Sequence, residues 1–167
     1  MAIKPDAVDG MLRQWKRQKP DLDSSGMAVV LRIMLLSGQF LDRLKDILEP
    51  AGLATWEYDV LSALRRAGPG VGVRPTELCK SAQLTSGAMT HRLDRLEERG
   101  LLRRESRTQD RRSIGVFLTP RGKKLVDSIV GARMVDAAEC LGALKKKQRR
   151  ELARLLRAVS AGFENED

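Results

Sequence analysis

Aromatic side chains are scarce in this 167-residue sequence, at 4% of its residues, and histidine occurs once, as His91. The two cysteines, Cys79 and Cys140, lie far apart and form no Cys-x-x-Cys pair. A zinc site or a Ser-His-Asp triad therefore lacks its usual residues unless His91 alone serves. We expect no metal, no cofactor and no enzymatic activity, because the sequence offers no phosphate loop and no cluster of titratable groups.

Long apolar runs are also missing. No run approaches the roughly 20 residues that a membrane-spanning helix needs. The first ten residues, "MAIKPDAVDG", carry acidic groups and lack the apolar core of a signal peptide. We therefore expect an intracellular, cytoplasmic protein with no membrane partner.

Positive charge is abundant and unevenly distributed. The formal net charge is +9, and the segment from Arg74 to Lys124 holds thirteen Lys and Arg residues against six Asp and Glu residues. A concentrated basic segment is typical of a nucleic-acid binder, because neutralised phosphates release their counterions. A solvated basic surface is the other interpretation, and charge alone does not separate the two.

Apolar residues recur at helical spacing in segments on both sides of this basic centre. The glycine-rich stretch "GPGVG" at 68–72 is predicted to be a turn, since no Lys-Thr or strand-turn-helix context supports a phosphate loop. The helices expected from this spacing cover 6–19, 27–48, 55–67, 119–144 and 146–163.

The basic centre predicts a compact DNA-binding motif. Two short helices, over 75–82 and from Thr85 to about Gly100, form a candidate helix-turn-helix. A strand after Gly100, a charged turn at 107–112 and a strand over 114–118 would form a hairpin, the wing. The fold class is thus mainly α with a small β-hairpin.

The two ends of the chain are amphipathic helices that must bury their apolar faces. Packing against a second copy would do so and would place two reading helices about one DNA turn apart; a monomer with its own four-helix core is the alternative. The predicted organisation is N-terminal helices for dimerisation (1–53), a winged helix-turn-helix lobe (54–120) and C-terminal dimerisation helices (121–167).

The helix that starts at Thr85 has two distinct faces. Met89, Leu93, Leu96 and Gly100 cluster on one side of the helical wheel, which we predict to be packed. The opposite side begins with small and polar groups, which suit entry into a major groove about 12 Å wide. These outward residues are Thr85, Ser86, Gly87, Thr90 and His91, followed by Arg95.

Arg92 falls on the flank of that helix and should point sideways. A charge that is partly removed from water needs a partner. Asp59, beside Trp56 on the preceding helix, is the candidate; two water-exposed charges are the alternative.

The segments "LTSGAMTHRLDRLEERGLLRR" (84–104) and "DRRSIGVFLTPRGKKL" (110–125) resemble the MarR family of bacterial winged-helix regulators, and the likeness extends over almost the full chain. The resemblance implies a homodimer on palindromic double-stranded DNA, with the helix from Thr85 in the major groove and the wing in the minor groove. It implies that Arg112 enters the minor groove with Asp110 orienting it, while Arg111 contacts phosphate and Arg107 adds a further DNA contact.

The stretch "QWKRQKPDLD" (14–23), on an added N-terminal helix, resembles the urate-responsive HucR/PecS-like branch of that family. The resemblance implies that Trp15, Asp59 and Arg92 bind a small anionic aromatic ligand, such as urate or a phenolic acid, whose arrival releases a repressor from DNA. His91 replaces the asparagine common in that branch, so the base preference does not carry over.

Two further hypotheses share the DNA-binding fold. A redox-responsive repressor could be switched by oxidation of Cys79, on the helix before the reading helix, although a small buried hydrophobe is the plainer role for a cysteine there. A ligand-independent architectural DNA binder would show no response to small molecules and little sequence preference.

Overall fold

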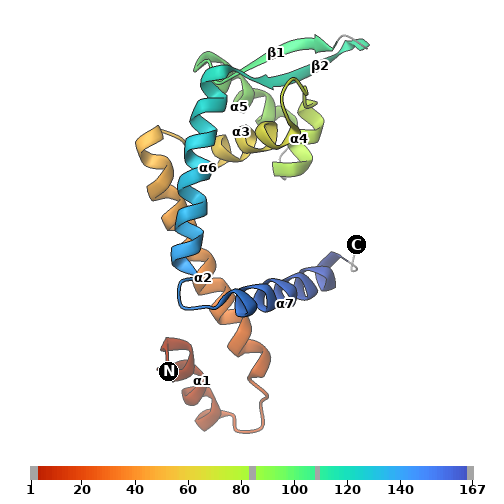
Figure 1. Ribbon diagram of the computed structural model, residues 1–167. Helices are drawn as coiled ribbons and strands as arrows, with labels where there is room; N and C mark the ends of the chain where they lie inside the picture. The colour runs from red at the N-terminus through yellow and green to blue at the C-terminus, as the bar shows by residue number, and fades with distance from the viewer. Residues whose placement is uncertain (1–3, 83–85, 108–109, 165–167) are drawn as a thin grey trace. The chain divides into compact units, whose positions relative to one another are not determined.

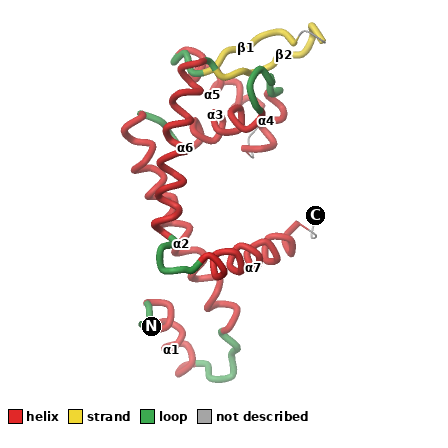
Figure 2. The backbone as a smooth tube through the Cα atoms, in the orientation of Figure 1, coloured by secondary structure: helices red, strands yellow, loops and turns green. Residues whose placement is uncertain are grey.

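A computed structural model describes residues 4–82, 86–107 and 110–164, without the side chains of 80–82, 86, 107, 110–113 and 164. It is mainly helical with one β-hairpin (Figures 1 and 2), which confirms the predicted fold class. The elements are α1 Ala7–Gln18, α2 Ser25–Leu48, the 3-10 helix η1 Glu49–Ala51, α3 Thr55–Ala67, α4 Pro75–Ala82, α5 Ser86–Glu98, β1 Leu102–Arg107, β2 Asp110–Leu118, α6 Pro120–Cys140 and α7 Lys146–Glu164.

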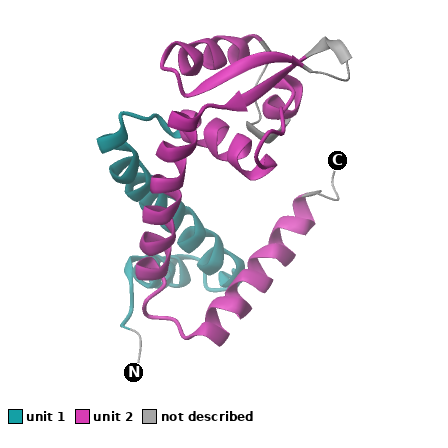
Figure 3. Cartoon of the chain, turned by 45° about the horizontal axis from the view of Figure 1, so that its top comes forward, with its two compact units in different colours: residues 1–55 teal, residues 56–167 magenta. Residues whose placement is uncertain are grey.

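The chain forms two compact units, Met1–Thr55 and Trp56–Asp167 (Figure 3). The first unit contains α1, α2 and η1. The second contains the predicted helix-turn-helix, the wing and the two C-terminal helices.

In the first unit, charged groups close the start of α1 and tie it to α2. Asp6 caps α1 by accepting a hydrogen bond from the Asp9 backbone N–H at 2.9 Å, and the Asp9 carboxylate accepts from the Asp6 N–H at 2.8 Å. The Arg32 guanidinium on α2 donates to both carboxylates, at 2.9 and 2.7 Å. The hydrogen bond from the Asp9 backbone N–H and the side-chain hydrogen bond from Arg32 lower the pKa of Asp6.

The second unit has a core to which most of its elements contribute. Leucines dominate this core, as expected where short helices pack closely on a hairpin. Its buried apolar side chains are Val60, Leu61, Leu64, Leu78, Met89, Leu93, Leu96, Leu101, Leu102, Val116, Val126 and Ile129.

The wing is an antiparallel hairpin in which Leu102 lies opposite Leu118 and Arg103 opposite Phe117. Both strands are longer than predicted: β1 reaches Arg107 and β2 starts at Asp110, so the predicted turn over 107–112 was wrong in extent. A register irregularity after Ser106 lets the ladder continue toward the tip despite the charged sequence. Val73 adds a single bridge to Val116, which the sequence reasoning missed.

The junction between α5 and α6 depends on two glycines. Gly100 ends α5 in the left-handed region, with φ 67°, and is exposed instead of packed as predicted. The Thr119 hydroxyl donates to the Gly100 carbonyl at 2.7 Å and accepts from the Gly122 N–H at 3.0 Å. A Cβ at Gly122 would lie 1.9 Å from the Leu101 carbonyl oxygen, so only glycine permits this approach.

The C-terminal helices differ slightly from the prediction. α6 ends at Cys140, and a turn follows in which Gly142 donates to the Glu139 carbonyl, so the expected extension to Leu144 was wrong. α7 begins at Lys146 as predicted and ends at Glu164. The rest of the acidic tail, whose fraying was predicted, lies outside the described residues.

Several long helices expose apolar side chains. On α2 these include Met34, Leu35 and Leu36, at 65, 53 and 46% exposure, and on α7 Leu155 and Phe163, at 48 and 72%. Among the described residues, no helix is both long and apolar enough to cross a bilayer.

Candidate nucleic-acid interface

The helix-turn-helix consists of α4 and α5, which contact each other across residues 83–85. The inner side of α5 is fully packed: Met89, Leu93 and Leu96 are each at most 1% exposed. This face confirms the amphipathic pattern, and it turns the opposite face of α5 outward.

The outward face of α5 carries the predicted reading residues. Gly87, Thr90, His91 and Arg95 are all exposed, and a Cβ at Gly87 would meet no atom within 4 Å. They occupy one sector of the helix, since spacings of three and four residues superpose on a helical wheel. Thr85 lies outside the described residues, and Ser86 begins α5 with its side chain undescribed.

Arg92 lies on the flank of α5, as predicted, but with a different partner. Its guanidinium carbon is 4.8 Å from the centre of the Trp56 ring on α3, and that of Arg95 is 5.5 Å from it. No ion pair joins Arg92 to Asp59 among the described residues. A delocalised guanidinium stacks well on an indole face, and the contact leaves its donors available.

Asp59, on α3, is exposed overall, yet desolvation raises the pKa of its carboxyl above 3.8. The positive charges of Arg66 and Arg133 oppose this rise without cancelling it. The carboxyl is thus held less firmly in its charged form than a fully solvated aspartate would be.

A four-group network that the sequence reasoning missed fastens the wing to α5. Arg104 of β1 donates from its guanidinium to Asp94 at 2.6 Å, to Glu97 at 3.0 Å and to the Thr90 carbonyl at 3.1 Å. The Arg104 backbone N–H also donates to Glu97, at 2.8 Å. The signal available in the sequence was the pair of acids three residues apart on one flank of α5.

A second ion pair connects α3 to the end of α5. The Glu57 carboxylate, only 2% exposed, accepts a hydrogen bond from Arg99 at 2.8 Å. A buried carboxylate is costly without a cation, so this pair restricts how α5 can lie on α3. Sequence alone did not indicate it, because Glu57 looks like an ordinary polar residue in a first helical turn.

The wing carries the remaining predicted DNA contacts. Arg107 closes β1, and Asp110, Arg111 and Arg112 open β2. Arg107 pairs with Asp110 at the far end of the ladder, and the side chains of all four residues lie outside the described part. The orientation of Arg112 by Asp110 therefore stays a prediction.

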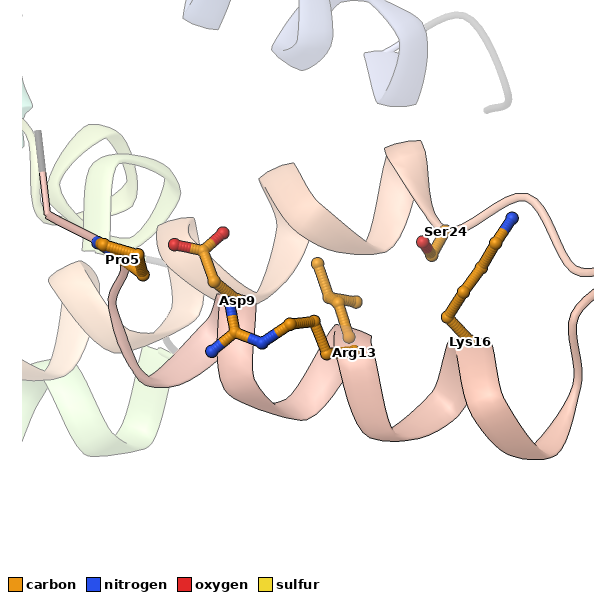
Figure 4. Close-up of a pocket in the computed structure, with 6 residues that line it drawn as sticks. Pro5, Asp9, Arg13, Lys16 and Ser24 are labelled. Atoms are coloured by element: carbon orange, nitrogen blue, oxygen red, sulfur yellow. The ribbon is translucent and has the colours of Figure 1, made fainter. Parts of the chain in front are cut away.

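The predicted ligand residues come from both units. Trp15 belongs to α1 of the first unit and is 57% exposed, whereas Asp59 and Arg92 belong to the second. A shallow pocket of about 470 Å³ lies on α1 (Figure 4). It is lined by Pro5, Asp9, Leu12, Arg13, Lys16 and Ser24. Trp15 is not among its lining residues.

The cysteines and the metal-binding residue types are the candidates for other sites. Cys79 and Cys140 are half-buried thiols and form no disulfide. Across the described residues, no group of three or more His, Cys, Asp or Glu side chains could hold a metal ion.

Comparisons with known proteins agree with this arrangement. Residues 51–113 match the MarR family. The HTH-type transcriptional regulator PecS of Dickeya dadantii is 30% identical over 161 residues, which cover 95% of each chain. AbsC of Streptomyces coelicolor superposes with a TM-score of 0.75 at 20% identity, over 86% of this chain and 97% of AbsC. The S. aureus MepR–DNA complex gives 0.68 at 18% identity, over 78% and 93%.

The fold and the site define a winged helix-turn-helix protein. The chain belongs to the MarR family, since its likeness to PecS extends over nearly its whole length. This confirms the family resemblance and supports its PecS-like branch.

Proposed function

We propose that this protein is a DNA-binding transcriptional regulator, a cytoplasmic repressor of its own or a divergent promoter. The observation that carries the proposal is the exposed start of α5, where Gly87, Thr90 and His91 present small and polar groups beside a basic wing. Short side chains let a helix approach base edges, and Arg95 adds a long donor one turn further on.

In this proposal the wing completes the grip on DNA. Arg112, oriented by Asp110, enters the minor groove, where a narrow groove concentrates negative potential. Arg107 and Arg111 contact the backbone nearby. One structural neighbour is MepR in complex with DNA, and the shared fold supports DNA binding by this chain.

The protein acts as a homodimer on palindromic DNA. A single chain leaves the apolar residues of α2 and α7 exposed, and a second copy would cover them. Two reading helices related by a two-fold axis would then meet half-sites about 34 Å apart.

A small anionic aromatic ligand, urate or a phenolic acid, releases the repressor through Trp15, Asp59 and Arg92. The contact between Arg92 and Trp56 gives the mechanism a concrete starting state. An anion that draws the Arg92 guanidinium from the Trp56 ring would rotate α5. The two reading helices would then no longer match the spacing of the two half-sites.

The first experiment is fluorescence anisotropy of the protein on DNA from its own upstream intergenic region, at fixed salt. We expect binding at nanomolar concentrations, and Arg95→Gln should weaken it more than tenfold, whereas Lys146→Gln on α7 should not. Equal binding to unrelated DNA would contradict specific regulation and favour the architectural hypothesis.

The ligand part is tested by titrating urate and then benzoate and salicylate into that complex. Release of DNA by wild type but not by Arg92→Ala or Trp15→Ala supports the site. Full release from Arg92→Ala would refute the proposed role of Arg92 while leaving DNA binding intact. Release by peroxide and not by the anions would favour the Cys79 switch.

The dimer is tested with Leu155→Asp on the apolar face of α7, measured by light scattering after size-exclusion chromatography. We expect a shift toward monomer mass and a loss of specific DNA binding. Ala161→Asp, on the opposite face of the same helix, is the control and should stay dimeric. A monomeric wild-type protein would contradict the proposal.

A further inference from the structure

A cavity of about 720 Å³ lies at the base of the wing, away from the reading face of α5. It is partly open to solvent and is bordered by the end of α3, the glycine-rich turn, both wing strands and the start of α6. Its lining residues are Leu64, Arg65, Gly68, Pro69, Gly70, Val71, Arg103, Phe117, Leu118, Thr119, Pro120 and Lys123. The volume falls within the roughly 300–1,000 Å³ typical of small-molecule sites.

The walls of this cavity are held in place without a ligand. Val73 exchanges two backbone hydrogen bonds with Val116, at 3.0 and 2.9 Å, which fixes the turn against β2. Gly72 lies so close to Phe117 that a Cβ there would be 2.4 Å from the ring. The Phe117 side chain is therefore positioned as one wall, and the cavity is preformed.

The lining combines an apolar surface with a surplus of positive charge. Arg65 is paired with Asp127, and Arg103 lies 4.9 Å from the Phe117 ring centre while it contacts Glu105 at 3.2 Å. Lys123 is exposed and forms no ion pair within the described part of the chain. One ammonium group is thus available beside an apolar wall.

We infer that this cavity binds a small aromatic monocarboxylate, with the carboxylate at Lys123 and the ring against Val71 and Phe117. A neutral molecule would leave the ammonium group unused, and a dianion would exceed the single available cation. The cavity shares no lining residue with the proposed Trp15, Asp59 and Arg92 site.

An occupant would contact the wing directly, because Arg103 and Phe117 face each other across β1 and β2. The same Arg103 guanidinium covers the Phe117 ring. A ring that enters the cavity therefore meets the strands whose tip is proposed to grip the minor groove.

The test is binding of 4-fluorobenzoate to the full-length protein, followed by its fluorine NMR signal, with the neutral 4-fluorobenzamide as the matched probe. A ligand of this size is expected to bind with a Kd near 1 mM or below. Lys123→Gln should weaken 4-fluorobenzoate at least fivefold. Lys124→Gln, an exposed neighbour outside the cavity, should leave its Kd unchanged.

Two further variants locate the probe. Val71→Trp, which fills the cavity from an exposed turn position, should abolish binding, while Trp15→Ala and Arg92→Gln should retain it. The inference is overturned if Lys123→Gln binds 4-fluorobenzoate like wild type, if 4-fluorobenzamide binds equally well, or if Trp15→Ala or Arg92→Gln loses the probe. Loss in the last two variants would instead assign the probe to the proposed effector site.

Discussion

The winged lobe and the long terminal helices use their apolar residues in opposite ways. In the lobe, α3, α5 and the wing bury side chains such as Leu61, Met89 and Val116 to 0% exposure. On α2 and α7, residues such as Met34 and Phe163 keep most of their surface in water, at 65 and 72%. The lobe is complete within one chain, whereas the terminal helices have apolar surface left to cover.

The polar contacts of the lobe and of α7 differ in the same sense. In the lobe, two ion pairs join different elements and restrict how α5 and the wing lie. One connects Glu57 to Arg99, and the other connects Arg104 to Asp94. On α7, the ion pair of Arg154 with Glu151 stays within one helix turn. The comparison teaches that packing within the chain positions the outward face of α5, whereas apolar side chains of α2 and α7 stay exposed in a single chain.

The largest effect should come from Gly122→Ala. The new methyl group would collide with the Leu101 backbone carbonyl, which cannot move without breaking the α5–α6 junction. We expect a loss of about 3 kcal/mol or more in the free energy of unfolding, measured with urea.

Gly131→Ala on the same helix is the matched control for this change. A Cβ there meets nothing within 4 Å, and alanine is the better helix former, so stability should stay equal or rise by about 0.5–1 kcal/mol. Equal losses in both variants would show that the junction is not the rigid point of the lobe.

Next in size is Arg99→Met, which leaves the buried Glu57 without this cation. Because Arg99 is 34% exposed, some water can reach the site, and we expect a loss of about 2 kcal/mol at pH 7. Arg99→Lys, which keeps the charge, should lose less; an equal loss in Arg99→Met and Arg99→Lys would refute the electrostatic cause.

A smaller effect is expected from Arg104→Gln, which loosens the wing from α5. Affinity for operator DNA should fall about tenfold, or about 1.4 kcal/mol. The slope of log affinity against log salt should not change, because Arg104 is held by Asp94 and Glu97 instead of a phosphate.

Arg95→Gln provides the contrast for that slope. If Arg95 neutralises a phosphate, its loss should reduce the slope by about 0.9. A similar reduction for Arg104→Gln would mean that Arg104 contacts DNA directly, and the positioning role would be wrong.

The smallest effect concerns Asp59. Desolvation raises its pKa in the fold, so the carboxyl favours folding below about pH 3.8 and opposes it as pH rises through the folded pKa. Asp59→Asn should therefore gain stability at pH 7, by less than about 1 kcal/mol since the residue is exposed. Thermal unfolding at pH 7 and pH 3 checks this, and a loss at pH 7 would contradict it.

Much of the fold could be predicted because it follows from local periodicity. The helices α1, α3 and α7 begin and end close to their predicted limits, because apolar spacing is a local signal. Pro75 likewise marks the start of α4, and Pro120 with the Thr119 cap marks the start of α6. The end of β1 and the start of β2, at the tip of the wing, were missed, because strand length depends on cross-strand pairing and not on the charged residues between the strands.

The candidate site was predictable only in part. The outward face of α5 follows from a helical wheel, and His91 and Arg95 are where that wheel places them. The partner of Arg92 does not follow from a helical wheel, because Trp56 and Asp59 lie one turn apart on α3. Only the packing of α3 on α5 decides that Arg92 contacts the Trp56 ring.

The sequence by itself determined the helix-turn-helix, the existence of the wing and the excess of basic charge around them, because periodicity, capping and composition are properties of neighbouring residues. Tertiary structure alone decided that Arg104 binds the α5 acids, that Glu57 is buried on Arg99 and that a cavity opens under Phe117. These contacts join residues up to 42 positions apart, and their geometry exists only once the helices and strands have packed.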